Sequence, residues 1–263
     1  PAVAELSGFD PAIVLADAPL ASTVPALTWS AFVGCGQTCV TIKRVYVVGD
    51  AAPWIDAMAQ RTESLRVGDP SQGEVDLGPM IHPEARSRFD QTIQSAIAAG
   101  AILRAGGRIV DGPGAFYRPT ILEARDDRPE RVLAGCFGPV LIVRSVPDED
   151  AAIEAANGSD FALAASVWGP SRRRARPIAE RLQAGVVSIN DAVAPTGHAR
   201  APFGGLRTSG HGRVHGEIGL HEFCHPQTLT ERRLGGIRPQ VFPYDDFIVK
   251  YLKFYKRLFY RGS

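Results

Sequence analysis

The sequence contains few cysteines, no long apolar run and almost no net charge. Four cysteines among 263 residues are too few for the disulfide framework of a secreted domain, so they are expected to be thiols in the cytoplasm. No stretch approaches the roughly 18 consecutive apolar residues that a membrane-spanning helix needs. The first residues also lack the charged and apolar regions of a secretory signal peptide.

The charges nearly balance, with 29 lysines and arginines against 28 acidic residues. This balance gives no reason to expect a nucleic-acid-binding surface. The basic surplus lies at the end of the chain, because residues 241–263 hold five lysines and arginines and two acids. At 45% hydrophobic residues, the sequence has ample material for a buried core.

Short apolar runs alternate with longer segments of helical periodicity, which is the pattern of an α/β domain with a mostly parallel, buried sheet. Five segments are predicted to be strands: 12–16, 44–48, 140–143, 164–168 and 186–189. Five are predicted to be helices: 25–32, 53–65, 83–99, 148–156 and 171–183. Pro83 at the start of the third helix and Gly185 after the last are typical start and stop signals.

A cysteine on a glycine-containing turn is the first candidate for catalysis. Gly36-Gln37-Thr38-Cys39 lies between a predicted helix and a predicted strand, and Glu5 stands upstream of it. Backbone N–H groups on such a turn can lower the pKa of a thiol and stabilise an oxyanion. A carboxylate nearby can activate water. The residues alone leave a second interpretation open, in which Cys39 is a buried structural thiol and Glu5 a surface charge.

Two motifs resemble signatures of the aldehyde dehydrogenase superfamily. Glu5-Leu6-Ser7-Gly8 resembles its Glu-Leu-Gly-Gly signature, with a serine in place of one glycine, and Gly36-Gln37-Thr38-Cys39 resembles its Gly-Gln-x-Cys signature. Further segments resemble the family in the same order, as far as about residue 232: 67–70, 77–81, 116–120, 137–140, 155–157, 185–190, 202–205 and 209–213. The resemblance implies the three-layer α/β fold of the catalytic domain of that family.

The resemblance implies oxidation of an aldehyde to a carboxylic acid, with NAD or NADP as the hydride acceptor. Cys39 would attack the aldehyde to form a thiohemiacetal, which becomes a thioester when its hydride leaves. Glu5 would activate the water that hydrolyses the thioester, and the Cys39 N–H would help to bind the oxyanion. The resemblance implies no metal.

The resemblance also indicates which residues contact cofactor and substrate. Phe137 and Leu6 correspond to positions beside the cofactor and Phe203 to one at the substrate end, although core packing is an alternative for both aromatic residues. Gly135 stands where the family has a glutamate that binds the cofactor ribose, and this loss is expected to weaken binding by about 1–3 kcal/mol. A cofactor-poor pseudoenzyme or structural subunit is therefore the alternative function. The neighbouring Cys136 is expected to be a passive core thiol.

The chain begins at Pro1, directly before the first signature. The glycine-rich turn, lysine and asparagine with which the family binds the rest of the cofactor have no counterpart in it. We therefore expect a C-terminal fragment that is inactive alone and belongs to a homo-oligomer, a dimer or a tetramer. Its expected parts are a remnant of the cofactor-binding domain at 1–8, the catalytic domain at 9–220, an oligomerisation strand region at 221–234, with the strand at 228–232, and a basic helical tail at 235–263.

Two rival metal sites are less well supported. His221-Glu222-Phe223-Cys224-His225 matches the His-Glu-x-x-His pattern of zinc hydrolases, but Gly219 and Pro226 leave too short a helix for two ligands one turn apart. Cys35 and Cys39 have the spacing of a metal-binding pair, but no second pair accompanies them.

Residues 247–261 place apolar and basic side chains at helical spacing, which predicts an amphipathic helix. Three interpretations stay open for it: docking on its own domain or a neighbouring subunit, contact with a membrane surface, and disorder.

Overall fold

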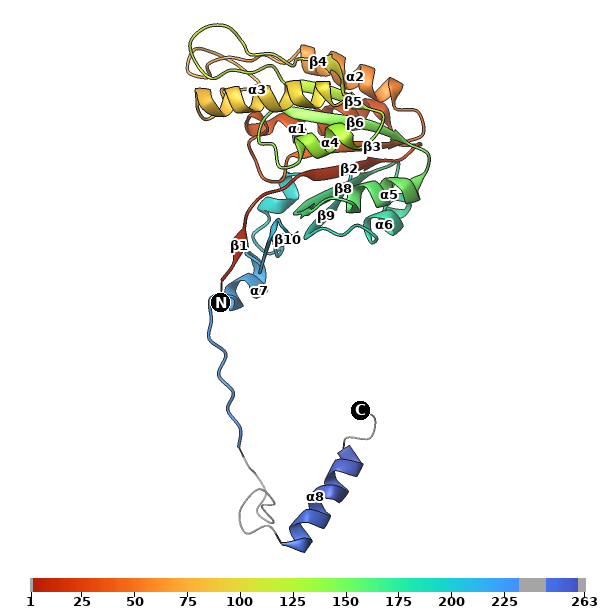
Figure 1. Cartoon of the computed structure of the whole chain (residues 1–263), viewed down its shortest axis with the longest axis vertical. Helices are drawn as coiled ribbons and strands as arrows, with labels where there is room; N and C mark the ends of the chain where they lie inside the picture. The colour runs from red at the N-terminus through yellow and green to blue at the C-terminus, as the bar shows by residue number, and fades with distance from the viewer. Residues whose placement is uncertain (1, 232–244, 260–263) are drawn as a thin grey trace. The chain divides into compact units, whose positions relative to one another are not determined.

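The computed structural model describes residues 2–231 and 245–259 (Figure 1). The chain divides into two compact units, Pro1–Cys224 and His225–Ser263. The first unit contains a layered α/β domain, and the second contains one described helix.

A seven-stranded sheet forms the middle layer of the first unit. In spatial order its strands are β4 (Ile102–Ala105), β5 (Thr120–Ala124), β6 (Val140–Val146), β3 (Ile42–Val48), β2 (Asp10–Val14), β8 (Ala164–Trp168) and β9 (Val186–Ile189). Neighbouring strands run parallel except for the antiparallel pair β4 and β5. The predicted mostly parallel α/β fold is confirmed.

Helices cover both faces of this sheet, as Figure 1 shows. One face carries α1 (Leu20–Phe32) and α2 (Ala52–Glu63), and the other carries α3 (Pro83–Ala98), α4 (Arg128–Leu133), α5 (Glu149–Asn157) and α6 (Arg172–Ala179). Side chains of successive strand residues point to opposite faces of the sheet. Val14 packs with α1 and α2, whereas Ile13 packs with α5 and α6. Both residues are fully buried, which explains why the strands read as continuous apolar runs.

The predicted helices are all present, with boundaries that differ most near prolines. α2, α3 and α5 begin and end within two residues of their predicted limits. α1 begins at Leu20 rather than at Pro25, because the helix continues through this proline with Val24 and Leu27 buried against the sheet. α6 ends at Ala179 instead of 183, and the chain beyond it tightens into shorter turns.

The five predicted strands are also present, but β4 and β5 are additional. Their short apolar patterns are interrupted by Arg104 and Glu123. These two charges meet across the antiparallel pair, where Nε of Arg104 donates to the carboxylate of Glu123 at 2.6 Å. Such a cross-strand ion pair becomes apparent only once the register is known.

The second unit is described in part. Residues 228–231 form no strand, and Arg232 lies outside the described residues, so the oligomerisation strand stays a prediction. The helix α8 (Asp246–Phe259) coincides with the predicted amphipathic segment, of which residues 260 and 261 are not described. None of the helices within 2–231 and 245–259 has the length and apolar character needed to cross a membrane.

Candidate active site

The candidate site lies where three neighbouring strands begin. β6, β3 and β2 are adjacent and parallel, so their amino ends meet at one edge of the sheet. Phe137 precedes β6, Cys39 precedes β3 and Glu5 precedes β2, each by a few residues. The topology therefore gathers three predicted site residues that are far apart in the sequence.

The segment after Glu5 touches the backbone of Cys39. At the buried Gly8, a Cβ atom would lie 2.1 Å from the carbonyl oxygen of Cys39. This distance means that the two chain segments are in direct backbone contact. Only glycine allows so close an approach, which explains why this position of the first signature is a glycine.

Glu5 is held at the site by a short antiparallel pair. The strand β1 (Ala4–Glu5) pairs with β11 (Gly210–His211), and the N–H of Leu6 donates to the carbonyl of Ser209 at 3.1 Å. Ser209 is fully buried and so provides a fixed point for this pairing. Glu5 itself remains exposed, so water reaches its side chain.

The half-buried thiol of Cys39 lies beside the carboxylate of Glu5. Burial raises the pKa of Cys39 most, and the charge of Glu5, a hydrogen bond with Glu5 and the charge of Asp10 raise it further, to about 12. At neutral pH Cys39 is therefore a thiol near a carboxylate, not a free thiolate. A nucleophile paired with an adjacent base is the arrangement that covalent catalysis uses.

We expect Glu5→Gln to speed the alkylation of Cys39 near pH 8 by about 3- to 10-fold, because losing the carboxylate charge lowers the pKa of the thiol and increases the thiolate fraction. In the unchanged chain the alkylation rate should keep rising up to a pH of about 10, because this pH is still below the pKa of Cys39. Timed iodoacetamide labelling with peptide mass spectrometry measures Cys39 separately from the other thiols. Glu180→Gln, at an exposed ion pair after α6, is the control. A slower reaction in Glu5→Gln would contradict this electrostatic account.

We expect Gly8→Ala to destabilise the protein by about 1–3 kcal/mol, because the added methyl group must push away the Cys39 carbonyl. Urea denaturation measures the change. Gly197→Ala is the matched control, since no atom lies within 4 Å of a Cβ there, and its stability should stay within about 0.5 kcal/mol of the original. Equal stability of the two variants would show that Gly8 and Cys39 do not touch.

Lys43 joins the loop of Cys39 to the loop of Phe137. The Nζ atom of this buried residue donates to the carbonyl of Gly36 at 2.7 Å and to that of Gly138 at 2.6 Å. The loops are also in backbone contact, because a Cβ on Gly36 would lie 2.3 Å from the Gly138 oxygen. Burial lowers the pKa of Lys43 to about 8. The sequence-based prediction does not include Lys43, since a lysine at the start of an apolar run is typical of an exposed strand end.

Asp10 is a second residue that the sequence-based prediction lacks. It is buried at the start of β2, and its Oδ1 accepts the N–H of Ala164 at 3.1 Å. Among the described residues its Oδ2 has no hydrogen-bond partner. Burial raises the pKa of Asp10 well above its usual range, although the Ala164 hydrogen bond and the charges of Arg44 and Lys43 oppose the shift. An aspartate before a proline is typical of a turn, so nothing local marks it as a buried group.

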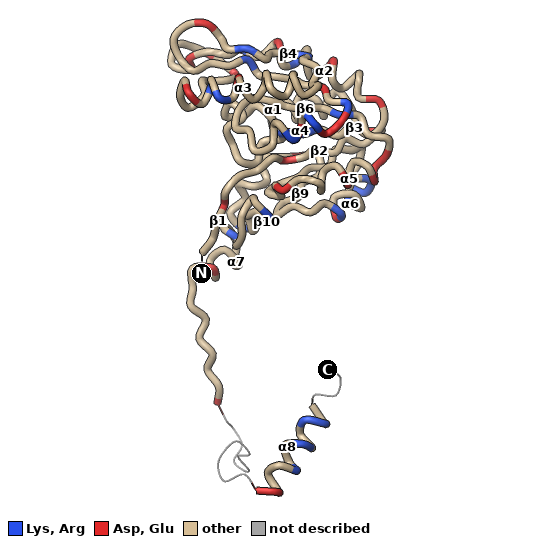
Figure 2. The backbone as a smooth tube through the Cα atoms, viewed as in Figure 1, with Lys and Arg blue, Asp and Glu red and all other residues tan. Residues whose placement is uncertain are grey.

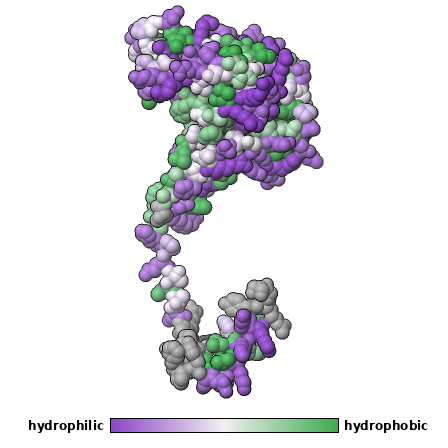
Figure 3. All heavy atoms as spheres, in the orientation of Figure 1, coloured by the Kyte–Doolittle hydropathy of each residue, from purple (hydrophilic) through white to green (hydrophobic). Residues whose placement is uncertain are grey.

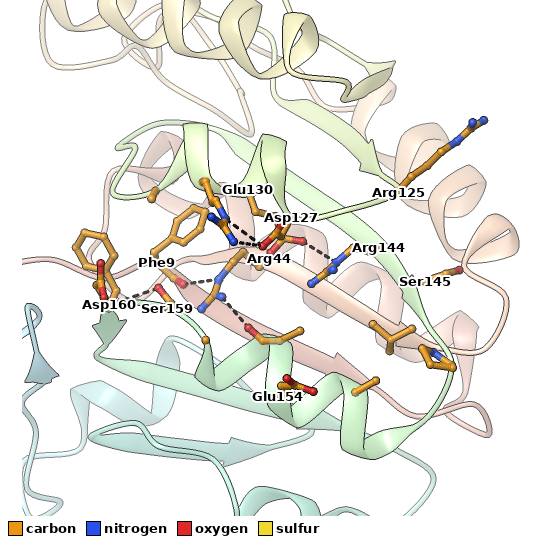
Figure 4. A pocket seen from close by; sticks show the side chains of 18 residues that line it. Phe9, Arg44, Arg125, Asp127, Glu130, Arg144, Ser145, Glu154, Ser159 and Asp160 are labelled. Carbon is orange, nitrogen blue, oxygen red and sulfur yellow. Dashed lines mark hydrogen bonds and ion pairs between the residues drawn. The ribbon is translucent and has the colours of Figure 1, made fainter.

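A polar network supports the site from the α4 and α5 side, on the floor of a hollow of about 940 Å³ (Figure 4). Arg44 donates to the carbonyl of Phe9 at 2.9 Å and to the hydroxyl of Tyr46 at 3.0 Å. Tyr46 donates to Glu130 at 2.6 Å, and Glu130 forms an ion pair with Arg144 at 2.8 Å. Glu130 balances the charge of Arg144, Arg44 is held by neutral acceptors, and its contact with Phe9 fixes the segment that follows Gly8.

Phe137 and Leu6 are available to a flat ring such as nicotinamide, with exposed fractions of 49% and 68%. Gly135 offers no acceptor side chain, and its backbone has a φ of +74°. A Cβ atom there would lie 3.0 Å from the ring of Phe161, so a glutamate would not fit this conformation without a change. This edge therefore lacks the carboxylate expected at the cofactor ribose, and the roles of Phe137 and Leu6 beside the cofactor stay predictions.

Phe203 reaches Cys39 through a shared apolar cluster. Both side chains pack against a small cluster formed by Val40, Leu163 and Ala164. The role of Phe203 at the substrate end stays a prediction, but this packing puts its ring on the same cluster as the candidate nucleophile.

The rival sites do not assemble. The helix α7 (Gly216–His221) ends at His221, so His225 is not one turn further along the same helix. Burial raises the pKa of both Cys35 and Cys136 to about 11, which keeps them protonated at neutral pH. In the part of the chain that the structure describes, no three potential metal ligands come together.

The chain matches the model of the aldehyde dehydrogenase family over residues 1–229. It is 36% identical over 233 residues to the succinate semialdehyde dehydrogenase (NAD(P)+) Sad of Escherichia coli, covering 88% of this chain and 50% of that protein. It is 34% identical over 230 residues to the succinate-semialdehyde dehydrogenase (NADP(+)) of Mycobacterium leprae, covering 87% and 50%. Among solved structures, it resembles the aldehyde dehydrogenase of Mycobacterium tuberculosis complexed with NAD+, with a TM-score of 0.79, 32% identity and coverage of 84% and 46%.

The chain spans about half the length of the curated relatives that it matches. The matched segment contains both signatures, the edge of the sheet where they meet and the strands that position them. On this evidence, the chain belongs to the aldehyde dehydrogenase family.

Proposed function

We propose that the protein oxidises an aldehyde to a carboxylic acid with NAD or NADP. The observation that carries this proposal is the Glu5 carboxylate beside the Cys39 thiol, at the edge of the sheet that also presents Phe137. The names of the relatives include NADP(+) and NAD(P)+, and one solved relative holds NAD+, which supports the choice of cofactor.

Covalent capture by Cys39 is the first step of the proposed mechanism. Glu5 accepts the thiol proton, the sulfur forms a bond with the aldehyde carbon, and the carbonyl oxygen becomes an alkoxide. The backbone N–H of Cys39 is a candidate donor to this alkoxide. When bound, the cofactor supplies the hydride acceptor, with Phe137 and Leu6 beside its ring. Loss of the hydride leaves a thioester on Cys39.

Hydrolysis by water is the second step. The exposed Glu5 releases its proton to solvent, and its carboxylate then accepts a proton from a water molecule whose oxygen attacks the thioester. The carbon–sulfur bond breaks, the thiolate of Cys39 takes a proton, and the carboxylic acid leaves. Glu5 thus makes this chain the hydrolytic type of enzyme.

Gly135 favours one alternative, a cofactor-poor pseudoenzyme or structural subunit of the same fold. One experiment distinguishes the dehydrogenase from this alternative. The full-length protein is mixed with NAD+ or NADP+ and a panel of aldehydes that includes succinate semialdehyde, and the ultraviolet absorbance of reduced nicotinamide is followed. Reduction with at least one aldehyde supports the dehydrogenase. No reduction with any aldehyde, while Cys39 still reacts with a thiol reagent, supports the alternative.

We further propose that the protein is a cytoplasmic dimer or tetramer. Among the described residues, β9 stands at the edge of the sheet with β8 as its one neighbour, which leaves its outer side open to another strand. Residues 228–232 are the proposed oligomerisation strand. Any membrane contact is made by residues 247–261 from the cytoplasmic side.

A further inference from the structure

Local signals specify the helix α8. The carboxylate of Asp245 accepts the N–H of Ile248 at 2.8 Å, and its carbonyl accepts the N–H of Val249 at 3.0 Å. Acidic residues therefore stand at the start of the helix, and Lys256 and Arg257 stand in its last turn. This distribution of charge matches the helix dipole. Asp245 and Asp246 stand at the start of the helix, and beyond this first turn all charged residues of α8 are cations.

The two sides of α8 have opposite character when its residues are placed about 100° apart. Apolar and aromatic residues occupy one side: Phe247, Ile248, Tyr251, Leu252, Phe254, Tyr255, Leu258 and Phe259. Cations occupy the other side around Val249: Lys250, Lys253, Lys256 and Arg257. Figure 2 shows the cations recurring along the helix, and Figure 3 shows its hydrophobic and hydrophilic surfaces.

Aromatic rings run along the apolar side. Tyr251 and Tyr255 have ring centroids 6.4 Å apart, and Tyr255 and Phe259 have centroids 4.5 Å apart. Tyrosine rings combine an apolar body with a polar tip, and such side chains favour the boundary between lipid chains and water.

A single helix cannot bury its own apolar side, so α8 needs a partner. The apolar side includes more than half of its 14 residues, which is wider than the two in seven of a coiled-coil seam. Along its polar side α8 carries four cations and a single acid, Asp246 at its first position, which favours a partner with negative charge. At a rise of about 1.5 Å per residue the helix is about 21 Å long, too short for a hydrocarbon core of about 30 Å.

We propose that α8 binds along the surface of an anionic phospholipid membrane. Its aromatic side lies between the lipid chains at the level of the headgroups. Its lysines and arginine contact the negatively charged headgroups on the other side. This interaction needs neither cofactor nor aldehyde, so its failure and the failure of the proposed catalytic function are distinguishable.

Vesicle flotation of the full chain tests the proposal. We expect at least about tenfold more protein to float with phosphatidylcholine vesicles that contain about 30% phosphatidylglycerol than with phosphatidylcholine alone. Raising the salt concentration from about 0.05 M to about 0.5 M should lower this binding several-fold, because salt screens the headgroup attraction. Absence of flotation, or equal flotation with both vesicles, would overturn the proposal.

Charge-reversal variants locate the binding surface. Lys250→Glu combined with Lys253→Glu and Lys256→Glu should lower binding to the anionic vesicles at least about tenfold. Arg172→Glu combined with Arg173→Glu and Arg200→Glu changes the net charge equally at exposed positions of the first unit and should leave binding unchanged. Equal losses in the two triple variants would contradict a role for α8.

Apolar variants separate lipid binding from docking on protein. Phe247→Ser combined with Leu258→Ser keeps every cation and should still lower vesicle binding several-fold, while circular dichroism reports a folded first unit. If this variant binds vesicles as well as the unchanged chain does, the membrane proposal fails. If light scattering also shows that the variant is a monomer where the unchanged chain is a dimer, the apolar side contacts protein.

Discussion

Replacing Cys39 by alanine is expected to lower the rate of aldehyde oxidation by the full-length protein at least about 10⁴-fold. Without the sulfur no bond to the aldehyde carbon forms, so the carbon is never held in position to lose its hydride. Serine at this position should be almost as inactive, because its hydroxyl is a far weaker acid than the thiol. Steady-state reduction of NAD(P)+ measures both variants.

The other thiols provide the controls for this experiment. Cys136 directly precedes Phe137 and is partly buried, and Cys224 is exposed. Cys136→Ala and Cys224→Ala should each keep turnover within about threefold, since neither side chain touches the proposed pair. If Cys136→Ala abolished turnover and Cys39→Ala preserved it, the nucleophile would be wrongly assigned.

Replacing Glu5 by glutamine is expected to lower steady-state turnover about 10²- to 10³-fold while leaving a first burst of reduced nicotinamide. Loss of the carboxylate lowers the pKa of Cys39, so the thiol still ionises and attacks the aldehyde. The thioester then persists, because no base activates water. Rapid mixing with absorbance detection separates the burst from later turnover.

Hydroxylamine distinguishes this outcome from general damage to the site. It attacks a thioester without help from a base, so it should restore turnover in Glu5→Gln but not in Cys39→Ala. No burst and no rescue in Glu5→Gln would mean that the thioester cannot form without Glu5, so the loss of turnover would not identify Glu5 as the base for hydrolysis.

The sequence predicts that candidate site residues stand shortly before strands. Cys39 and Phe137 each stand directly before a predicted strand, and the amino ends of adjacent parallel strands lie together. Glu5 precedes β2 in the same manner. The alternation of strands and helices therefore predicts the layered fold, whereas the order β6, β3, β2 that brings these residues together is known from the structure.

The charged residues behind the site could not be predicted in this way. Lys43 and Arg44 are consecutive charges in a strand, a pattern that is typical of an exposed edge. They are buried because Gly138, the α4 segment and the α5 segment cover them, and their partners lie far away in the sequence. Local patterns cannot reveal such contacts, since the buried positions depend on which helices cover the strand.

In the C-terminal tail too, the local structure can be predicted from the sequence and the binding partner cannot. The spacing of Tyr251, Tyr255 and Phe259 predicts α8, because an amphipathic helix is a local pattern. The binding partner of its apolar side cannot be predicted from a local pattern, because the partner is another molecule or segment. The charges of Lys250 and Lys253 on the opposite side support the proposal of an anionic membrane.

Mass spectrometry of the Glu5→Gln protein after brief exposure to an oxidisable aldehyde and NAD(P)+ tests the central claim most directly. We predict that the mass of the intact protein rises by that of one acyl group, that peptide analysis places the group on Cys39, and that hydroxylamine removes it. An acyl group on another residue, or no acyl group while reduced nicotinamide accumulates, would contradict the assignment of Cys39 as nucleophile and Glu5 as the base for hydrolysis.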